Sequence, residues 1–127
     1  MNKKKLIILA TIVLIVISIF LVVYNNKKVF IGSKLKEVNK YVLNIEKMNG
    51  NDTHTLNLCK NDRLKVYFTT IKGYLKLSIK GSDNNIIYEG DGEQAQDFII
   101  NIEKDGIYTI SVEARYAEGK IYIQKKQ

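Results

Sequence analysis

Cysteine and histidine occur only once each in this chain of 127 residues, and proline and tryptophan do not occur at all. Because Cys59 is the only cysteine, no disulfide can form within the chain, and a small secreted scaffold stapled by disulfides is excluded. Because His54 is the only histidine, a Ser-His-Asp triad or a zinc site would have to be built around this single residue. We therefore expect no enzymatic activity, no catalytic residues, no metal and no cofactor.

Two alternatives to this expectation rest on particular residues. His54 and Cys59 would form a nucleophile pair, but an odd separation along a strand directs side chains to opposite faces, so we expect a polar histidine at a strand start and a half-buried cysteine. A calcium site would use oxygen ligands from two loops, but their spacing does not match an EF-hand and favours turn formation. The residues concerned are Asp83, Asn84, Asn85, Asp91 and Glu93.

Acidic residues are in the minority, with 13 against 20 basic residues and a net charge of +7. Lys3, Lys4, Lys5, Lys27 and Lys28 flank one apolar segment, which leaves 15 basic against 13 acidic residues from position 29 onward. The remainder of the chain is therefore close to neutral, and nucleic acid is not expected as a partner.

That apolar segment, residues 6–24, contains no charge, proline or glycine. A helix of this length spans about 28 Å, close to the hydrocarbon thickness of a bilayer. A cleaved signal peptide has a shorter apolar stretch and a pair of small residues after it, which this segment lacks. We predict an uncleaved signal anchor in the cell membrane, with residues 1–5 in the cytoplasm. Lysines lie on both sides of the segment, and we place the C-terminal domain outside because a lysine-rich N-terminus is hard to translocate.

Residues 25–40 are polar and rich in lysine, which predicts a stalk between the anchor and the domain. The end of this segment fits two interpretations. Leu35, Val38, Val42 and Ile45 follow helical spacing, and Ser33 is available as an N-cap. Alternation over residues 41–48, together with nearby asparagines, instead favours a strand, which is the interpretation we prefer.

Alternation of apolar and polar residues continues to the end of the chain and is typical of strands with one wet face. Turn-forming clusters separate the runs, at residues 72–73, 81–85, 90–92, 105–106 and 118–119. We predict an all-β domain over residues 41–127, an antiparallel β-sandwich or jelly roll of seven or eight strands. The expected inward positions are Leu56, Leu58, Leu64, Val66, Phe68, Leu75, Leu77, Ile79, Phe98, Ile100, Ile102, Tyr108, Ile110, Val112, Ala114, Ile121 and Ile123.

The runs at residues 63–68, 72–79, 105–112 and 118–121, with a glycine shortly before a tyrosine at two strand starts, resemble known bacterial proteins. Over residues 52–124 the chain is similar to β-sandwich domains of small membrane-anchored envelope proteins of Gram-positive bacteria. It is more distantly similar to pre-peptidase C-terminal domains. The resemblance implies carbohydrate or protein binding and carries no catalytic residues.

Outward positions around residues 72–73 supply the candidate binding surface, because we expect a hairpin there with both strands presenting one face to solvent. Tyrosine rings stack on sugars, and lysines attract anionic polymers. An ordinary solvated sheet face is the alternative interpretation. The candidate residues are Lys65, Tyr67, Tyr74, Lys76 and Lys80.

We expect a non-catalytic binding or scaffolding role in the cell envelope, with the membrane and an envelope polymer or protein as partners. The alternative is a small accessory or immunity-type membrane protein that acts through its helix. That helix lacks the spaced pair of small residues that promotes helix association in membranes.

Overall fold

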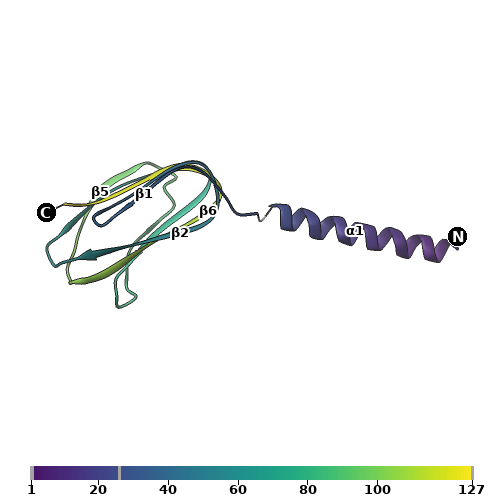
Figure 1. The fold of residues 1–127 in the computed structure, drawn as a ribbon, viewed down its shortest axis with the longest axis horizontal. Coiled ribbons are helices and arrows are strands. Elements are labelled where there is room, and N and C mark those ends of the chain that lie inside the picture. The colour runs from purple at the N-terminus through teal and green to yellow at the C-terminus, as the bar shows by residue number, and fades with distance from the viewer. Residues whose placement is uncertain (1, 26, 127) are drawn as a thin grey trace.

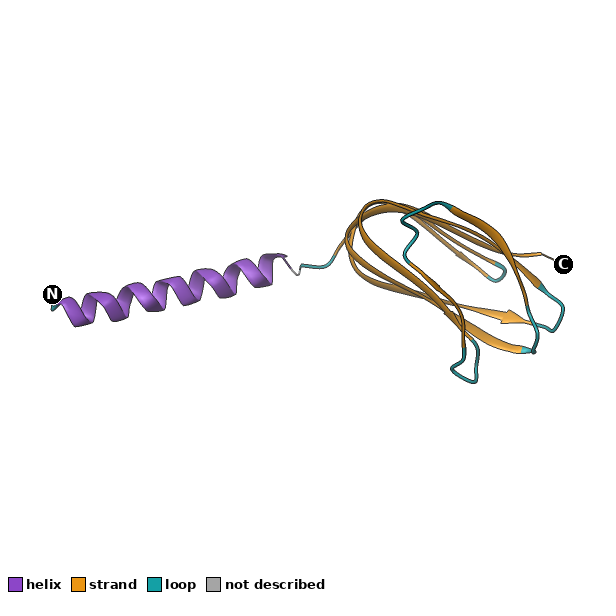
Figure 2. Ribbon diagram, turned by 180° about the vertical axis from the view of Figure 1, so that it is seen from behind, coloured by secondary structure: helices purple, strands orange, loops and turns teal. Residues whose placement is uncertain are grey.

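The computed structural model describes residues 2–25 and 27–126. Met1, Asn26 and Gln127, which belong to the expected N-terminus, stalk and domain end, lie outside the described residues. One helix, α1 (Lys3–Asn25), precedes a mainly β domain built from one antiparallel sheet of six strands (Figures 1 and 2). The strands are β1 (Val29–Glu37), β2 (Lys40–Leu58), β3 (Arg63–Lys80), β4 (Ile86–Gly90), β5 (Gln96–Asn101) and β6 (Gly106–Lys126).

Three of the strands, β2, β3 and β6, are two to four times longer than the others and bend in the middle. The bends coincide with register shifts, and such bulges increase the local twist of a strand. The bent sheet folds over so that its two halves face one another (Figure 2). The first half contains β1, β5 and residues 40–48, 63–70 and 117–126, and the second half contains β4 and residues 50–58, 74–80 and 106–114.

The core lies between the two halves and is entirely apolar among the described residues. The predicted inward positions of β2, β3 and β6 are confirmed as buried, and Phe98 and Ile100 of β5 pack against them. Leu77 of β3 and Ile110 of β6 are fully buried on neighbouring strands. The alternation of the sequence thus identifies the face that each strand buries.

The strand count and the stalk differ from expectation. The clusters at residues 72–73 and 118–119 do not end strands but lie inside β3 and β6 at the bend, so six strands form where we expected seven or eight. Residues 29–37 of the expected stalk form the edge strand β1, paired with β2. Its burial pattern is mostly exposed, which explains why no apolar alternation marked it. The predicted strand over residues 41–48 is confirmed as part of β2.

Two ends of the domain are distinct. At the bend edge the long strands turn over beside α1, and Val29 at the start of β1 pairs with Asn49 there (Figure 1). At the opposite, open end the long strands β2, β3 and β6 begin and finish, and the turns at residues 59–62, 81–85 and 102–105 lie there.

Candidate functional site

The predicted binding residues do not share one surface. Because β3 continues through Gly73 and makes no hairpin there, Lys65 and Tyr67 lie in the first half of the sheet and Tyr74, Lys76 and Lys80 in the second. All five are exposed or half-buried, as their outward positions predict. The two groups therefore lie on the outer surfaces of opposing halves. The prediction that they share one hairpin face was wrong.

Two of these residues have local partners on the second half. The Nζ of Lys76 lies 2.7 Å from Oε1 of Glu89 on β4. The guanidinium carbon of Arg115 lies 5.4 Å from the centre of the Tyr74 ring. These contacts engage the Lys76 ammonium group and the Tyr74 ring within the domain. The outer surface of the second half is therefore a weaker candidate for ligand binding than its composition suggests.

A cavity of about 570 Å³ opens at the open end of the domain, where the turn at residues 81–85 meets residues 100–105. It is bounded on the inside by β4 and β5, whose Tyr88 and Phe98 rings lie 4.9 Å apart and join the two halves along this side. Its lining combines carboxylate and amide groups with apolar side chains. Among the lining residues are Asp83, Asn85, Ile87, Ile100, Glu103 and Tyr108.

The polar groups of this cavity are held by short contacts. Oδ1 of Asp83 accepts a hydrogen bond from the backbone N–H of Asn85 at 3.1 Å, and this bond, with the nearby charge of Lys104, lowers the pKa of Asp83. The hydroxyl of Tyr108 donates to the carbonyl oxygen of Lys104 at 2.6 Å, and burial of the ring raises the pKa of Tyr108. Hydrogen-bond acceptors beside apolar side chains in one cavity suit a ligand that has both hydroxyl groups and apolar faces.

The two loops considered for calcium lie at opposite ends of the domain. Asp83 closes the turn at the open end, whereas Gly92, beside Asp91, accepts a hydrogen bond from Thr70 at the bend edge. Within residues 2–25 and 27–126, no group of three or more His, Cys, Asp or Glu side chains is placed to hold a metal ion. Asp83 and Asp91 serve as turn formers.

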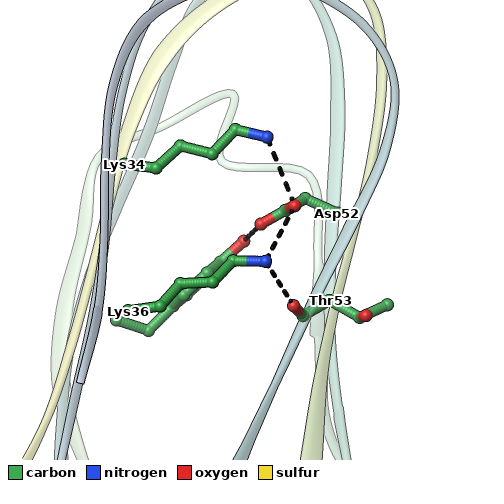
Figure 3. A network of polar contacts seen from close by, with 5 residues as sticks. Lys34, Lys36, Asp52 and Thr53 are labelled. Atoms are coloured by element: carbon green, nitrogen blue, oxygen red, sulfur yellow. Dashed lines mark hydrogen bonds and ion pairs between the residues drawn. The ribbon is translucent and has the colours of Figure 1, made fainter.

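A cluster of polar side chains closes the other side of the domain, where β1 faces the second half of β2 (Figure 3). Oδ1 of Asp52 lies 3.3 Å from Nζ of Lys34 and 3.1 Å from Nζ of Lys36, and its Oδ2 accepts a 2.5 Å hydrogen bond from the hydroxyl of buried Tyr41. Lys36 also donates to the carbonyl oxygen of Thr53. We call Lys34, Lys36, Tyr41 and Asp52 the polar seam.

The seam perturbs the ionisation of half-buried Asp52 and of buried Tyr41. Burial opposes the charged form of Asp52, but the hydrogen bonds from Tyr41 and Lys36 and the charges of Lys34 and Lys36 outweigh it and lower the pKa of Asp52. Burial and the neighbouring carboxylate raise the pKa of the Tyr41 hydroxyl far above its usual value. Because every polar group of the seam has a partner inside the domain, we assign it a structural role. Sequence reasoning missed it because Lys34 and Lys36 belonged to the expected stalk.

His54 and Cys59 are not brought together. The His54 ring stacks on Tyr41 with centroids 5.3 Å apart, and its Nε2 lies 2.7 Å from the carbonyl oxygen of Glu37. It lies within β2 and not at a strand start. Cys59 is exposed in the turn after β2, where we expected a half-buried side chain. The geometry provides no nucleophile pair.

Acid should weaken the domain through Asp52. Since the pKa of Asp52 is lower in the folded than in the unfolded state, its contribution to stability is complete above the unfolded value of 3.8 and is lost as pH falls below it. We expect Asp52→Asn to lower the free energy of unfolding by about 1–2 kcal/mol at neutral pH. We also expect the free energy of unfolding of this variant to fall less on acidification than that of the wild type. Urea unfolding of the full chain in detergent micelles, at neutral pH and at about pH 3, measures both effects.

Asp97→Asn is the matched control, because Asp97 is exposed on β5 away from the seam. If acid lowers the free energy of unfolding of Asp52→Asn as much as that of the wild type, the role assigned to the seam is contradicted.

Comparison with known proteins yields distant similarity only. No family model matches the chain, and no curated protein matches it. Among solved structures, TmCBM61 in complex with beta-1,4-galactotriose is similar with a TM-score of 0.38 and 14% identity. The similarity covers 72% of this chain and 64% of that one, so the chain spans less than two thirds of its length.

A second similar structure is accessory secretory protein 1, 2 and 3 of Streptococcus pneumoniae, with a TM-score of 0.34 and 11% identity over 76% of this chain and 86% of that one. At these scores neither similarity carries an argument about the site. The resemblance to pre-peptidase C-terminal domains is likewise matched by no family model.

Proposed function

We propose that this chain is a single-pass membrane protein that holds its β domain on the outer side of the cytoplasmic membrane as a non-catalytic binding domain. The observation that supports it is that the apolar helix α1 is exposed along its length. Residues 3–24 have the length and composition of a membrane span, and the helix packs against none of the strands. An apolar helix exposed all round is not stable in water, and lipid is the environment that would cover it.

Details of α1 fit that environment. The hydroxyls of Thr11 and Ser18 donate to the carbonyl oxygens of Ile7 and Leu14, both at 2.9 Å, so that these polar groups are satisfied within the helix. Tyr24 lies at the end of the apolar segment, where an interfacial aromatic ring is favourable. The cluster Lys3–Lys5 at the other end supports a cytoplasmic N-terminus.

For the ligand we propose the open-end cavity as the binding site. In this orientation it lies at the end of the domain away from the membrane, where an envelope polymer would be accessible. Its carboxylate and amide groups beside Ile87 and Ile100 suit a hydroxyl-rich polymer, and its volume accommodates a few sugar rings. The outward residues Lys65, Tyr67, Tyr74, Lys76 and Lys80 remain an alternative, divided between two surfaces.

Protease shaving of intact cells that carry the chain with an epitope tag after its last residue tests the topology. We expect loss of the tag with a cytoplasmic marker protected, because an outward-facing domain and its tag are accessible to protease. In a Gram-negative host the outer membrane is permeabilised first. A tag that is cut only after lysis would invert the topology and contradict the proposal.

The binding step uses the same tagged chain, solubilised in detergent and applied to immobilised wall polymers and envelope glycans. We expect retention of the wild type and loss of retention in Ile87→Asp, which places a charge on the exposed apolar side of the cavity. The control Ile107→Asp changes another exposed isoleucine, which lies outside the cavity lining. Equal retention of both variants would remove the cavity from the proposal.

A further inference from the structure

Exposed apolar side chains gather at the bend edge. Ile71 is 63% exposed, Tyr116 52% and Tyr74 41%, although they lie close together on β3 and β6. Ile71 occupies a register shift of β3 between Thr70 and Lys72. Tyr116 lies at the bend of β6 with a φ of 46°. The bend thus holds an aliphatic and two aromatic side chains outward, which marks an interaction surface when they are contiguous.

The end of α1 lies at the same edge. Only three residues separate Asn25 from Val29, and a chain of that length spans at most about 14 Å. Nδ2 of Asn49 donates to the carbonyl oxygen of Lys27 at 3.0 Å, which ties the connection to the bend. Lys28, Asn49, Arg115 and Tyr116 line one hollow of about 240 Å³. The connection that follows α1 and the exposed Tyr116 are therefore neighbours.

This short connection limits how far the domain can stand from the bilayer. The headgroup layer on each side of a bilayer is roughly 5–8 Å thick. A connection that spans at most about 14 Å must cross this layer, so the bend edge can lie no more than about 10 Å beyond it. Tyrosine is favourable in that layer because one end of its ring is apolar and the other is wet. An aliphatic side chain beside it is favourable at the boundary between headgroups and acyl chains, where its apolar surface leaves water.

We propose that the bend edge rests on the surface of the bilayer that holds α1, with Ile71 and Tyr116 inserted in the interfacial layer. This inference rests on the proposed function, since it needs α1 in the membrane. The occupant is lipid, because the helix brings the edge to the bilayer at high effective concentration. The open-end cavity is then directed away from the membrane.

Charge does not drive this contact. Arg115 pairs with Glu113 at 3.1 Å, and Lys72 lies 3.9 Å from Glu118. Asp91 and Glu93 lie in the loop that contacts Thr70, and they give the bend edge two negative charges against the two positive charges of Lys27 and Lys28. The edge is therefore close to neutral, and contact with zwitterionic lipid is expected to be as good as contact with anionic lipid.

The absence of tryptophan allows single-tryptophan reporters in the full chain. I71W and Y116W report on the bend edge, I107W on an exposed position at the open end, and F20W on α1. Each variant is reconstituted in phosphatidylcholine vesicles, with and without bromine near the headgroup end of the acyl chains. Circular dichroism melts confirm that each variant is folded.

We expect bromine to quench the emission of F20W, I71W and Y116W and to leave that of I107W unchanged. Quenching of F20W without quenching of I71W and Y116W would overturn the inference and leave the anchor in place. A lack of quenching in F20W would instead reject the anchor, and the inference with it. Equal quenching of I107W would also overturn the inference, as would a blue shift at the bend edge without quenching, which indicates a protein partner or a second copy.

Discussion

Leu77→Ala and Ile110→Ala will each lower the free energy of unfolding by about 2–5 kcal/mol, because each removes methyl groups from a close-packed core. Both side chains are fully buried between the halves of the sheet, on the neighbouring strands β3 and β6. Since a small domain is stable by only about 5–15 kcal/mol, either change removes a large part of the total. Urea unfolding of the full chain in detergent micelles, followed by circular dichroism, measures the loss.

Ile107→Ala is the control for this pair. Ile107 is also on β6 but is 57% exposed, so its loss should change stability by less than about 0.5 kcal/mol. Urea unfolding curves of Leu77→Ala and Ile110→Ala that match the wild type would mean that the strands are displaced by one residue, which turns every side chain to the other face.

Gly73→Ala is the second change with a large expected effect, because it acts on the bend itself. Gly73 has a φ of +70°, and a Cβ atom there would lie 2.1 Å from the carbonyl oxygen of Tyr116 and 2.6 Å from that of Arg115. Both obstacles are backbone atoms of β6 and cannot rotate away. We expect a loss of about 4 kcal/mol or more, or failure to fold, from strain and steric overlap combined.

Gly50→Ala separates these two causes. Gly50 lies at the bend of β2 with a φ of +138°, but the nearest atom to its Cβ would be a side-chain carbon of Lys28 at 3.6 Å. This variant carries the backbone strain without the overlap, so its loss should be smaller. Equal losses in the two variants would show that close packing of β3 on β6 does not explain the need for glycine at position 73.

Much of the architecture could be predicted from local pattern. The uncharged run at residues 6–24 is sufficient to predict α1, because a helix that must satisfy its own backbone needs only length and apolar side chains. Alternation with a period of two predicted which residues of β2, β3 and β6 face inward, since successive side chains of a strand point to opposite faces. These signals depend on near neighbours in the sequence.

The bends could not be predicted in this way. Residues 72–73 and 118–119 have the composition of hairpin turns, but glycine also permits the bulges that let β3 and β6 continue across the bend. Which of the two forms is decided by the neighbouring strands, because β6 pairs with β3 on both sides of the bend. The same reason explains β1, an edge strand whose exposed side chains give no apolar alternation.

The candidate sites depend on contacts between distant segments. The open-end cavity joins residues 81–87 to residues 100–108, and the polar seam joins Asp52 to lysines 16 and 18 positions earlier in the chain. Outward positions such as Lys65 and Tyr74 could be identified from the sequence, but their placement on opposing halves could not. A residue pattern defines a face of one strand and leaves open which faces become neighbours.

The sequence by itself determined an apolar helix near the N-terminus, an all-β domain after it, and the inward face of each long strand. These properties follow from hydrophobicity and from side-chain periodicity, which act over a few residues. Only the tertiary structure decided that three strands bend through both halves of one sheet, that β1 replaces the stalk, and that the bend lies beside the helix. Those features depend on hydrogen bonds and packing between segments far apart in the chain, which no local pattern encodes.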